Sequence, residues 1–214
     1  MLKICFLLLI VIYSLYPKLT YPIEDRQAWL ELKFEYDLTN KLSLELSEEL
    51  RYYENYTRLS QFITDIGLEY GLTDFFTTGL FYRYRINPDN NEFRNEIYTN
   101  LSFKLILGDF TLTDRTRIHI KFRNNESTIN NLRNMLTLNF KINKYLRTYI
   151  STELFYRFFY EKGDRLTQGR YYIGMKFRVD KNNLFDLFYM REQEYNINKA
   201  IHSNVLGFGY KFSF

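Results

Sequence analysis

Cysteine and histidine are almost absent from this sequence of 214 residues, and their scarcity excludes several kinds of chemistry. The one cysteine, Cys5, lies near the amino terminus, so the rest of the chain has no disulfide and no thiol nucleophile. The two histidines, His119 and His202, are far apart, whereas a metal site needs several histidines or carboxylates together. We therefore expect no metal and no other cofactor.

Proline is also rare, and long apolar segments are missing. Three prolines and the lack of any Ser/Gly-rich stretch leave no visible linker, which indicates one domain over residues 22–214. The apolar run at residues 4–16 is shorter than the ~20 residues of a membrane-spanning helix. Because Lys3 precedes this run, it predicts a secretory signal peptide over residues 1–21, cleaved between Pro17 and Asp25.

The net charge gives no sign of a nucleic-acid partner. The sequence has 29 basic and 25 acidic residues, and removal of Lys3 and Lys18 with the signal leaves 27 against 25. No basic motif for nucleic acid is present. We therefore expect no nucleic-acid partner.

Aromatic residues and alternation of apolar with polar residues are abundant. The sequence has twenty Tyr and twenty Phe, yet 25% of its residues are charged. Alternation with period two predicts β-strands that each have one apolar face, and no amphipathic helix pattern competes with it. Eleven segments show this alternation: 27–37, 42–53, 61–72, 75–85, 92–105, 110–123, 130–142, 145–157, 167–179, 184–192 and 202–214.

The connections between these segments alternate in length. Tight turns start near residues 38, 72, 107, 142 and 180, which makes a hairpin the repeating unit, and longer polar loops lie between them. Short turns at one end and longer loops at the other are typical of outer-membrane barrels. The sequence therefore predicts an all-β, antiparallel transmembrane β-barrel of 10–12 strands. Because such barrels usually have an even number, we favour twelve strands, with a short one hidden in residues 21–27; otherwise one of the eleven lies outside the wall.

The apolar face of these strands is expected to face lipid. Most of the segments reach the ~9–11 residues that cross a bilayer at a tilt, and an apolar lining would not fill a barrel of this many strands. Aromatic residues also gather near both strand ends, as in the two interfacial belts of membrane barrels. Glu48 and Asp114 fall on the lipid side of this register, and we attribute them to a β-bulge that shifts it.

The final segment "GFGYKFSF" alternates aromatic residues up to Phe214. On the predicted strand these even-numbered residues face lipid. An unclosed barrel has a bare strand edge that a partner strand can satisfy, and the ending is similar to the carboxy-terminal signal that the barrel assembly machinery recognises. The residues of this predicted assembly signal are Gly209, Tyr210, Phe212 and Phe214.

Three segments resemble a known family. They are "AWLELKFEYDLTNKLSLELSEELRYYEN", "YLRTYISTELFYR" and "QGRYYIGMKFRVDKNNLFDLFY", followed by the Phe ending. With these features the chain after the signal resembles domain of unknown function 2490, a family of small bacterial outer-membrane barrels. The resemblance implies fold and location only, because the family has no established catalytic residues to carry over.

The positions expected to face the lumen divide by charge. An acidic sector on the first three strands comprises Glu31, Glu35, Glu45, Glu49, Asp65 and Glu69. A basic lining on later strands comprises Arg115, Arg117, Arg123, Arg147, Arg170, Lys176 and Arg178. If the acidic sector reached across to the bases, about six ion pairs would occlude the middle, although an excess of cations would still need water and counter-anions.

Function remains divided among three classes. The basic excess favours a narrow, porin-like channel in the Gram-negative outer membrane with anion preference for small solutes. The alternative is a structural or binding barrel with a salt-bridged, occluded lumen. A hydrolase is disfavoured, because His202 and Ser203 are adjacent on a strand and so point to opposite faces. The expected partners are outer-membrane lipid and the assembly machinery; the oligomeric state stays open.

Overall fold

The computed structural model describes residues 23–122, 129–159, 163–196 and 200–214. The predicted signal peptide and Arg123 lie outside these residues. The described residues form eleven strands, and none of them is helical. The strands are β1 (Ile23–Asp37), β2 (Leu42–Tyr53), β3 (Arg58–Gly71), β4 (Phe76–Asn87), β5 (Glu92–Leu107), β6 (Phe110–Phe122), β7 (Ile129–Lys141), β8 (Leu146–Phe158), β9 (Arg165–Arg178), β10 (Asn183–Glu194) and β11 (Ile201–Ser213).

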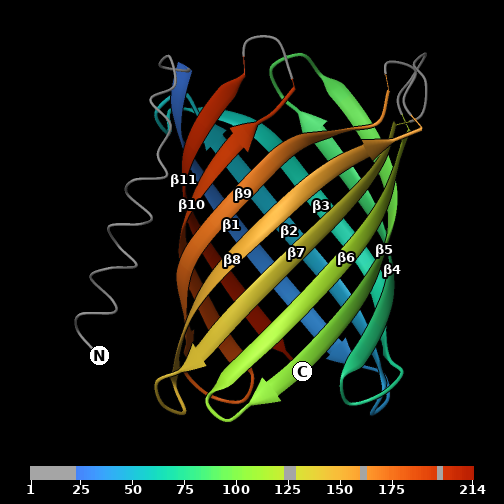
Figure 1. Ribbon diagram of the computed structural model, residues 1–214, viewed down its shortest axis with the longest axis vertical. Coiled ribbons are helices and arrows are strands. Elements are labelled where there is room, and N and C mark those ends of the chain that lie inside the picture. The colour runs from blue at the N-terminus through green and yellow to red at the C-terminus, as the bar shows by residue number, and fades with distance from the viewer. Residues whose placement is uncertain (1–22, 123–128, 160–162, 197–199) are drawn as a thin grey trace.

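The strands close into one barrel, which confirms the predicted fold class (Figure 1). Consecutive strands pair antiparallel, and β1 pairs with β11 in parallel from Ile23↔Ile201 to Glu35↔Ser213. A parallel seam follows from an odd strand number, because the first and last strands then run in the same direction. The favoured count of twelve is wrong for the described residues: residues 23–27, where we expected a separate short strand, are the beginning of β1, and all eleven counted strands lie in the wall.

The tight turns lie at the lower end of the barrel in Figure 1 and the other connections at the upper end. Two of the upper connections, residues 54–57 and 88–91, are as short as the tight turns, so the expectation of longer loops is wrong there. The reason is that β3 begins earlier, and β4 ends later, than their alternation indicated. Glu54, Asn55 and Tyr56 all have positive φ, which lets the chain reverse within four residues.

The two faces of the wall differ in polarity as the alternation predicts. Large apolar residues cover the outside, and Leu80 and Ile173 are 63% and 60% exposed. Charged residues are buried inside, and Glu96 and Glu153 are 0% and 2% exposed. This is the reverse of a soluble barrel and suits a wall in lipid. No helix among the described residues has the length and apolarity needed to cross a membrane.

The β-bulge proposed for Glu48 and Asp114 is not the explanation of their position. The register shifts lie elsewhere, between Arg51 and Tyr52 and between Phe155 and Tyr156.

Both acidic side chains do face outward, and each has a polar partner on the next strand. The Thr64 hydroxyl donates to Glu48 Oε2 at 2.8 Å, and Asn134 Nδ2 donates to Asp114 Oδ1 at 2.7 Å. A hydrogen bond lowers the cost of an acidic group on this face. The outward position is therefore accommodated by pairing and not by a change of register.

Candidate functional site

The acidic sector forms one wall of the lumen, and its carboxylates pair locally. Lys33 Nζ lies 3.0 Å from Glu45 Oε1, and both residues are on neighbouring strands. Along the same wall, Arg51 Nε donates to Glu49 Oε1 at 2.8 Å.

Further along this wall, Arg83 on β4 donates two hydrogen bonds to Asp65 on β3, at 2.7 and 2.6 Å. All of these pairs join residues of one strand or of adjacent strands. None of these three pairs is a bridge across the lumen of the kind that the occluded alternative requires.

The other three acidic residues differ in their partners. Glu35 Oε2 pairs with Lys211 Nζ on β11 at 2.5 Å, across the parallel seam. Within the part of the chain that the structure describes, Glu31 and Glu69 have no ion-pair partner. The nearest lysine along β1 from Glu31 is Lys33, and its ammonium group is engaged by Glu45.

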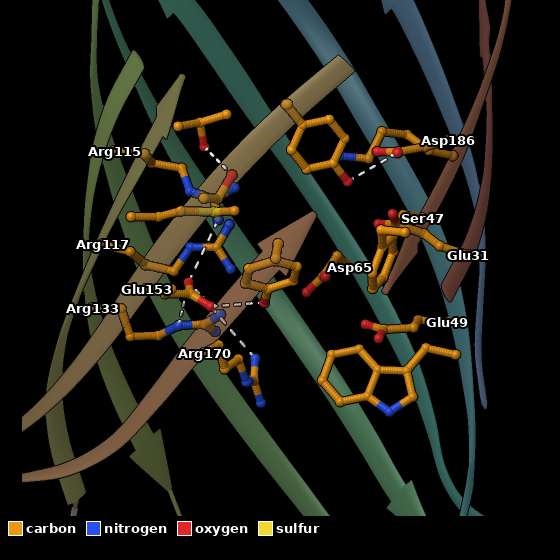
Figure 2. Close-up of a pocket in the computed structure, with 18 of the residues that line it drawn as sticks. Glu31, Ser47, Glu49, Asp65, Arg115, Arg117, Arg133, Glu153, Arg170 and Asp186 are labelled. Atoms are coloured by element: carbon orange, nitrogen blue, oxygen red, sulfur yellow. Dashed lines mark hydrogen bonds and ion pairs between the residues drawn. The ribbon is translucent and has the colours of Figure 1, made fainter. Parts of the chain in front are cut away.

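The opposite wall is basic and is organised around Glu153 on β8. Arg133 Nη2 lies 2.8 Å from Glu153 Oε1, and Arg115 Nη2 lies 3.6 Å from the same oxygen. Arg170 Nη1 lies 3.6 Å from Glu153 Oε2, and Arg170 Nε also pairs with Glu192 at 2.6 Å. One buried carboxylate thus holds together three guanidinium groups from β6, β7 and β9 (Figure 2).

Two arginines of this wall have guanidinium N–H groups without an acceptor among the described residues. Arg117 donates from Nε to Asn100 at 2.6 Å and lies 4.0 Å from the centre of the Tyr98 ring, and it has no ion pair among the described residues. Arg115 donates to Met135 Sδ at 3.1 Å, and its buried Nε has no partner. Buried donors of this kind favour an acceptor brought by water or solute.

A cavity of about 250 Å³ lies between the two walls. In Figure 2, Glu31, Glu49 and Asp65 are on one side of it, and Arg115 and Arg117 are on the other. The middle of the lumen is therefore not filled by bridges between the sectors.

Large aromatic rings lie against the inner face of the wall, and two of them, Tyr149 and Phe188, line the central cavity. Three inward rings lie directly opposite a glycine on the adjacent strand, in the pairs Phe81–Gly67, Tyr149–Gly174 and Phe188–Gly207. A Cβ added at each glycine would lie 2.3, 2.6 and 1.9 Å from the facing ring. The absent side chains therefore let the rings lie flat on the wall.

Three more cavities extend the central one toward both ends. Cavities of about 450 and 130 Å³ at the loop end share Arg51 and Arg170 with the central cavity, and one of about 210 Å³ at the tight-turn end shares Lys176. Sixteen Lys and Arg and eight Asp and Glu line the four cavities. Two of these cations pair with carboxylates outside the linings, Arg85 with Glu96 at 3.4 Å and Arg94 with Glu92 at 2.7 Å.

The residues of the predicted basic lining fall into two groups. Arg115, Arg117 and Arg170 line the central cavity, whereas Arg147 and Arg178 line the cavity at the tight-turn end and Lys176 lines both. In the predicted acidic sector, the residues at the central cavity are Glu31, Glu45, Glu49 and Asp65.

Sequence reasoning missed the partners that come from other strands. Trp29 lies under two guanidinium groups, with Arg51 Cζ at 3.7 Å and Arg170 Cζ at 4.8 Å from its ring centre. His119 Nδ1 lies 3.0 Å from Glu96 Oε2, a carboxylate on the neighbouring strand. The period-two pattern shows which residues point inward, but it does not show which of them meet.

The residues considered for hydrolysis point apart. The Ser203 hydroxyl is buried inside the wall, where it accepts a hydrogen bond from Gln27 Nε2 at 3.0 Å. His202 occupies the adjacent position and so the opposite face of β11. This pair does not have the geometry of a nucleophile and its base.

Comparison with known proteins agrees with the barrel fold. Among solved structures, a NanC porin superposes with a TM-score of 0.52 at 15% sequence identity, over 78% of this chain and 86% of the porin. At that identity the likeness shows the fold alone. A search of the curated proteins gives no match. The family described as "Protein of unknown function (DUF2490)" matches residues 26–202, so the chain belongs to this family, as its sequence resemblance indicated.

Proposed function

We propose that this protein is a narrow outer-membrane channel that prefers small anions. The observation that carries the proposal is the series of cavities with shared lining residues, from the loop end to the tight-turn end, with twice as many basic as acidic side chains. Lining cations that outnumber the lining carboxylates favour water and counter-ions in the confined space, and a basic lining admits anions more readily than cations.

The two ends of the series contribute most to this preference. The cavity of about 210 Å³ at the tight-turn end is lined by five basic residues and by no Asp or Glu of the described chain. Near the loop end, the cavity of about 130 Å³ likewise has basic residues and no carboxylate among its described lining, and the cavity of about 450 Å³ has six basic residues against Glu192 and Glu194. An anion that enters at either end replaces its lost water with guanidinium and ammonium donors.

An outer-membrane location is part of the proposal. The apolar outside, the charged lumen and the porin-like fold support it. The signal peptide expected over residues 1–21 and the aromatic ending of β11 would serve export and assembly.

A second candidate is a barrel with a blocked lumen. The layer formed by Trp29, Arg51 and Arg170 favours it, because these side chains line the boundary between the central cavity and the large cavity at the loop end. A structural or binding role would need no passage through this layer.

Planar-bilayer recording of purified protein separates the two candidates. A channel of the proposed kind gives a small conductance, and its reversal potential across a KCl gradient shows anion preference. Arg115→Glu with Arg117→Glu should lower that preference. Arg58→Glu is the matched control, because Arg58 is half exposed and pairs with Glu54 and Asp89 outside the cavities. Cation preference in the wild type contradicts the proposal, and no conductance favours the blocked barrel.

A further inference from the structure

We propose that the central cavity binds a small zwitterion, with its ammonium group toward Glu31 and its oxyanion toward Arg115 and Arg117. This inference deepens the proposed function and rests on it in one respect, that small solutes reach the cavity from at least one end. It differs from a general preference for anions, because it assigns a ligand group to each wall.

Glu31 is the receptor for the positive group. Its carboxylate lines the cavity and has no ion-pair partner among the described residues, since Lys33 is held by Glu45 at 3.0 Å. Its position opposite Gly209 on β11 keeps its surroundings open, because even a Cβ added at Gly209 would lie 3.8 Å from Glu31 Oε2. An ammonium group would give this carboxylate the charge-assisted hydrogen bond that the protein leaves unmade.

Arg117 and Arg115 are the receptors for the negative group. The Arg117 guanidinium uses Nε for Asn100 and lies over Tyr98, which leaves its terminal N–H groups without a carboxylate in the described chain. The distance from Arg115 Nη2 to Glu153 Oε1 is long, at 3.6 Å, because Arg133 and Arg170 share the same carboxylate. Two forked donors side by side suit a carboxylate or another small oxyanion.

The barrel places these groups on opposite walls. β1 and β6 are five strands apart in one direction around the barrel and six in the other. Strands about 4.8 Å apart and tilted by about 40° give eleven-stranded walls about 22 Å across between opposite backbones. Glu31 and Arg117 extend toward each other from these walls into the same cavity (Figure 2).

The central cavity has room for a compact ligand. Its volume of about 250 Å³ corresponds to about eight water molecules at about 30 Å³ each. A compact amino acid such as 4-aminobutyrate has a similar number of non-hydrogen atoms. Tyr98, Tyr149 and Trp29 also line the cavity, although neighbouring side chains bury most of each residue.

A ligand with one charge satisfies only one wall. A monocarboxylate that binds the arginines leaves Glu31 without a partner, and an alkylamine that binds Glu31 leaves the arginines without one. A zwitterion gives each wall a charge-assisted hydrogen bond in place of water, so it should bind more tightly than either half.

Trp29 gives a direct measure of binding that does not depend on conductance. It is the one tryptophan of the sequence and lines the cavity. We would titrate the detergent-purified full-length protein with 4-aminobutyrate, butyrate and butylamine and follow Trp29 emission. The expected result is saturable binding of 4-aminobutyrate with a Kd about tenfold below those of butyrate and butylamine. Equal response to all three, or no response to 4-aminobutyrate, overturns the inference.

Variants then test the assignment of groups. Glu31→Gln should raise the Kd for 4-aminobutyrate about tenfold and leave that for butyrate unchanged, and Glu31→Asp should restore part of the affinity. Glu69→Gln is the matched control, because Glu69 also faces inward without an ion-pair partner in the described chain but does not line this cavity. Equal effects of Glu31→Gln and Glu69→Gln contradict the assignment.

The two proposals fail in different ways. If bilayers carry an anion current but 4-aminobutyrate binds no better than butyrate, this inference is wrong and the channel stands. If 4-aminobutyrate binds as expected but no current flows, the channel is wrong and the site stands.

Discussion

The ring of Phe188 on β10 lies over Gly207 on β11, so that a Cβ on Gly207 would lie 1.9 Å from Phe188 Cζ. Side chains do not approach this closely, and the ring therefore needs the glycine. Since Phe188 lines the central cavity, a larger residue at position 207 in the wall should change the shape of the lumen.

Gly207→Ala should both destabilise the barrel and narrow the cavity. The added methyl group displaces the Phe188 ring toward the lumen, which should lower the free energy of unfolding by about 1–3 kcal/mol and reduce the conductance. Gly209→Ala is the matched control two residues away, because its Cβ would meet its nearest atom at 3.5 Å. Urea unfolding in detergent and bilayer recording measure the two effects. Equal stability of both variants would show that the ring moves without cost.

Glu153→Gln should weaken the basic wall. Its carboxylate is 2% exposed and is shared by Arg115, Arg133 and Arg170, so its neutralisation removes the anion of Arg115 and Arg133, whereas Arg170 keeps Glu192. Loss of one partner from a buried ion pair costs about 3–5 kcal/mol. We expect a lower urea midpoint and a stronger anion preference. Glu54→Gln, in an exposed pair, should cost less than about 0.5 kcal/mol. A stable Glu153→Gln protein would mean that cavity water and anions replace the carboxylate.

Much of the fold could be predicted because a membrane strand alternates apolar and polar residues over its whole length. The bounds of β2 are as predicted, and most other ends differ by one to four residues. Whether a charged side chain faces the lumen or the outside also follows from its odd or even position along the strand, as for Asp65 and Arg83.

The contacts in the lumen could not be predicted in the same way. They depend on the register between strands and on side chains far apart in the sequence: Glu153 meets Arg115 38 positions earlier, and Trp29 meets Arg170. The parallel β1–β11 seam is likewise a property of closure, which no local pattern shows.

The outward pair Glu48–Thr64 can be tested by removal of either member. Glu48→Leu removes an acidic group from the apolar face and should leave the stability unchanged or raise it by about 1 kcal/mol. Thr64→Val leaves the carboxylate without its donor at 2.8 Å and should cost about 1–3 kcal/mol. In the Glu48→Leu background, Thr64→Val should have little effect. Urea titration of the four proteins gives the coupling. If Glu48→Leu alone is strongly destabilising, Glu48 has a contact outside this chain.

Phe212→Ala with Phe214→Ala should impair assembly in the cell. The two ring centres lie 4.6 Å apart at the end of β11, and the centre of the Phe214 ring lies 6.1 Å from that of Tyr36 on β1. The Phe214 N–H also donates to the Glu35 carbonyl at 2.9 Å, so the end of the chain lies at the closing seam. We expect lower levels in the outer membrane and degradation products in the periplasm.

The matched control for this last prediction removes another aromatic pair near a tight turn. Phe75 and Phe103 have their ring centres 5.6 Å apart, and their double alanine variant loses similar area without altering β11. Purified protein refolded into lipid vesicles separates recognition from stability. If the ending is an assembly signal, the Phe212/Phe214 variant refolds as the control does, with the same heat-modifiable band on a gel, and fails only in cells. If both variants assemble equally well in cells, the two phenylalanines serve the wall alone, as any belt residues would.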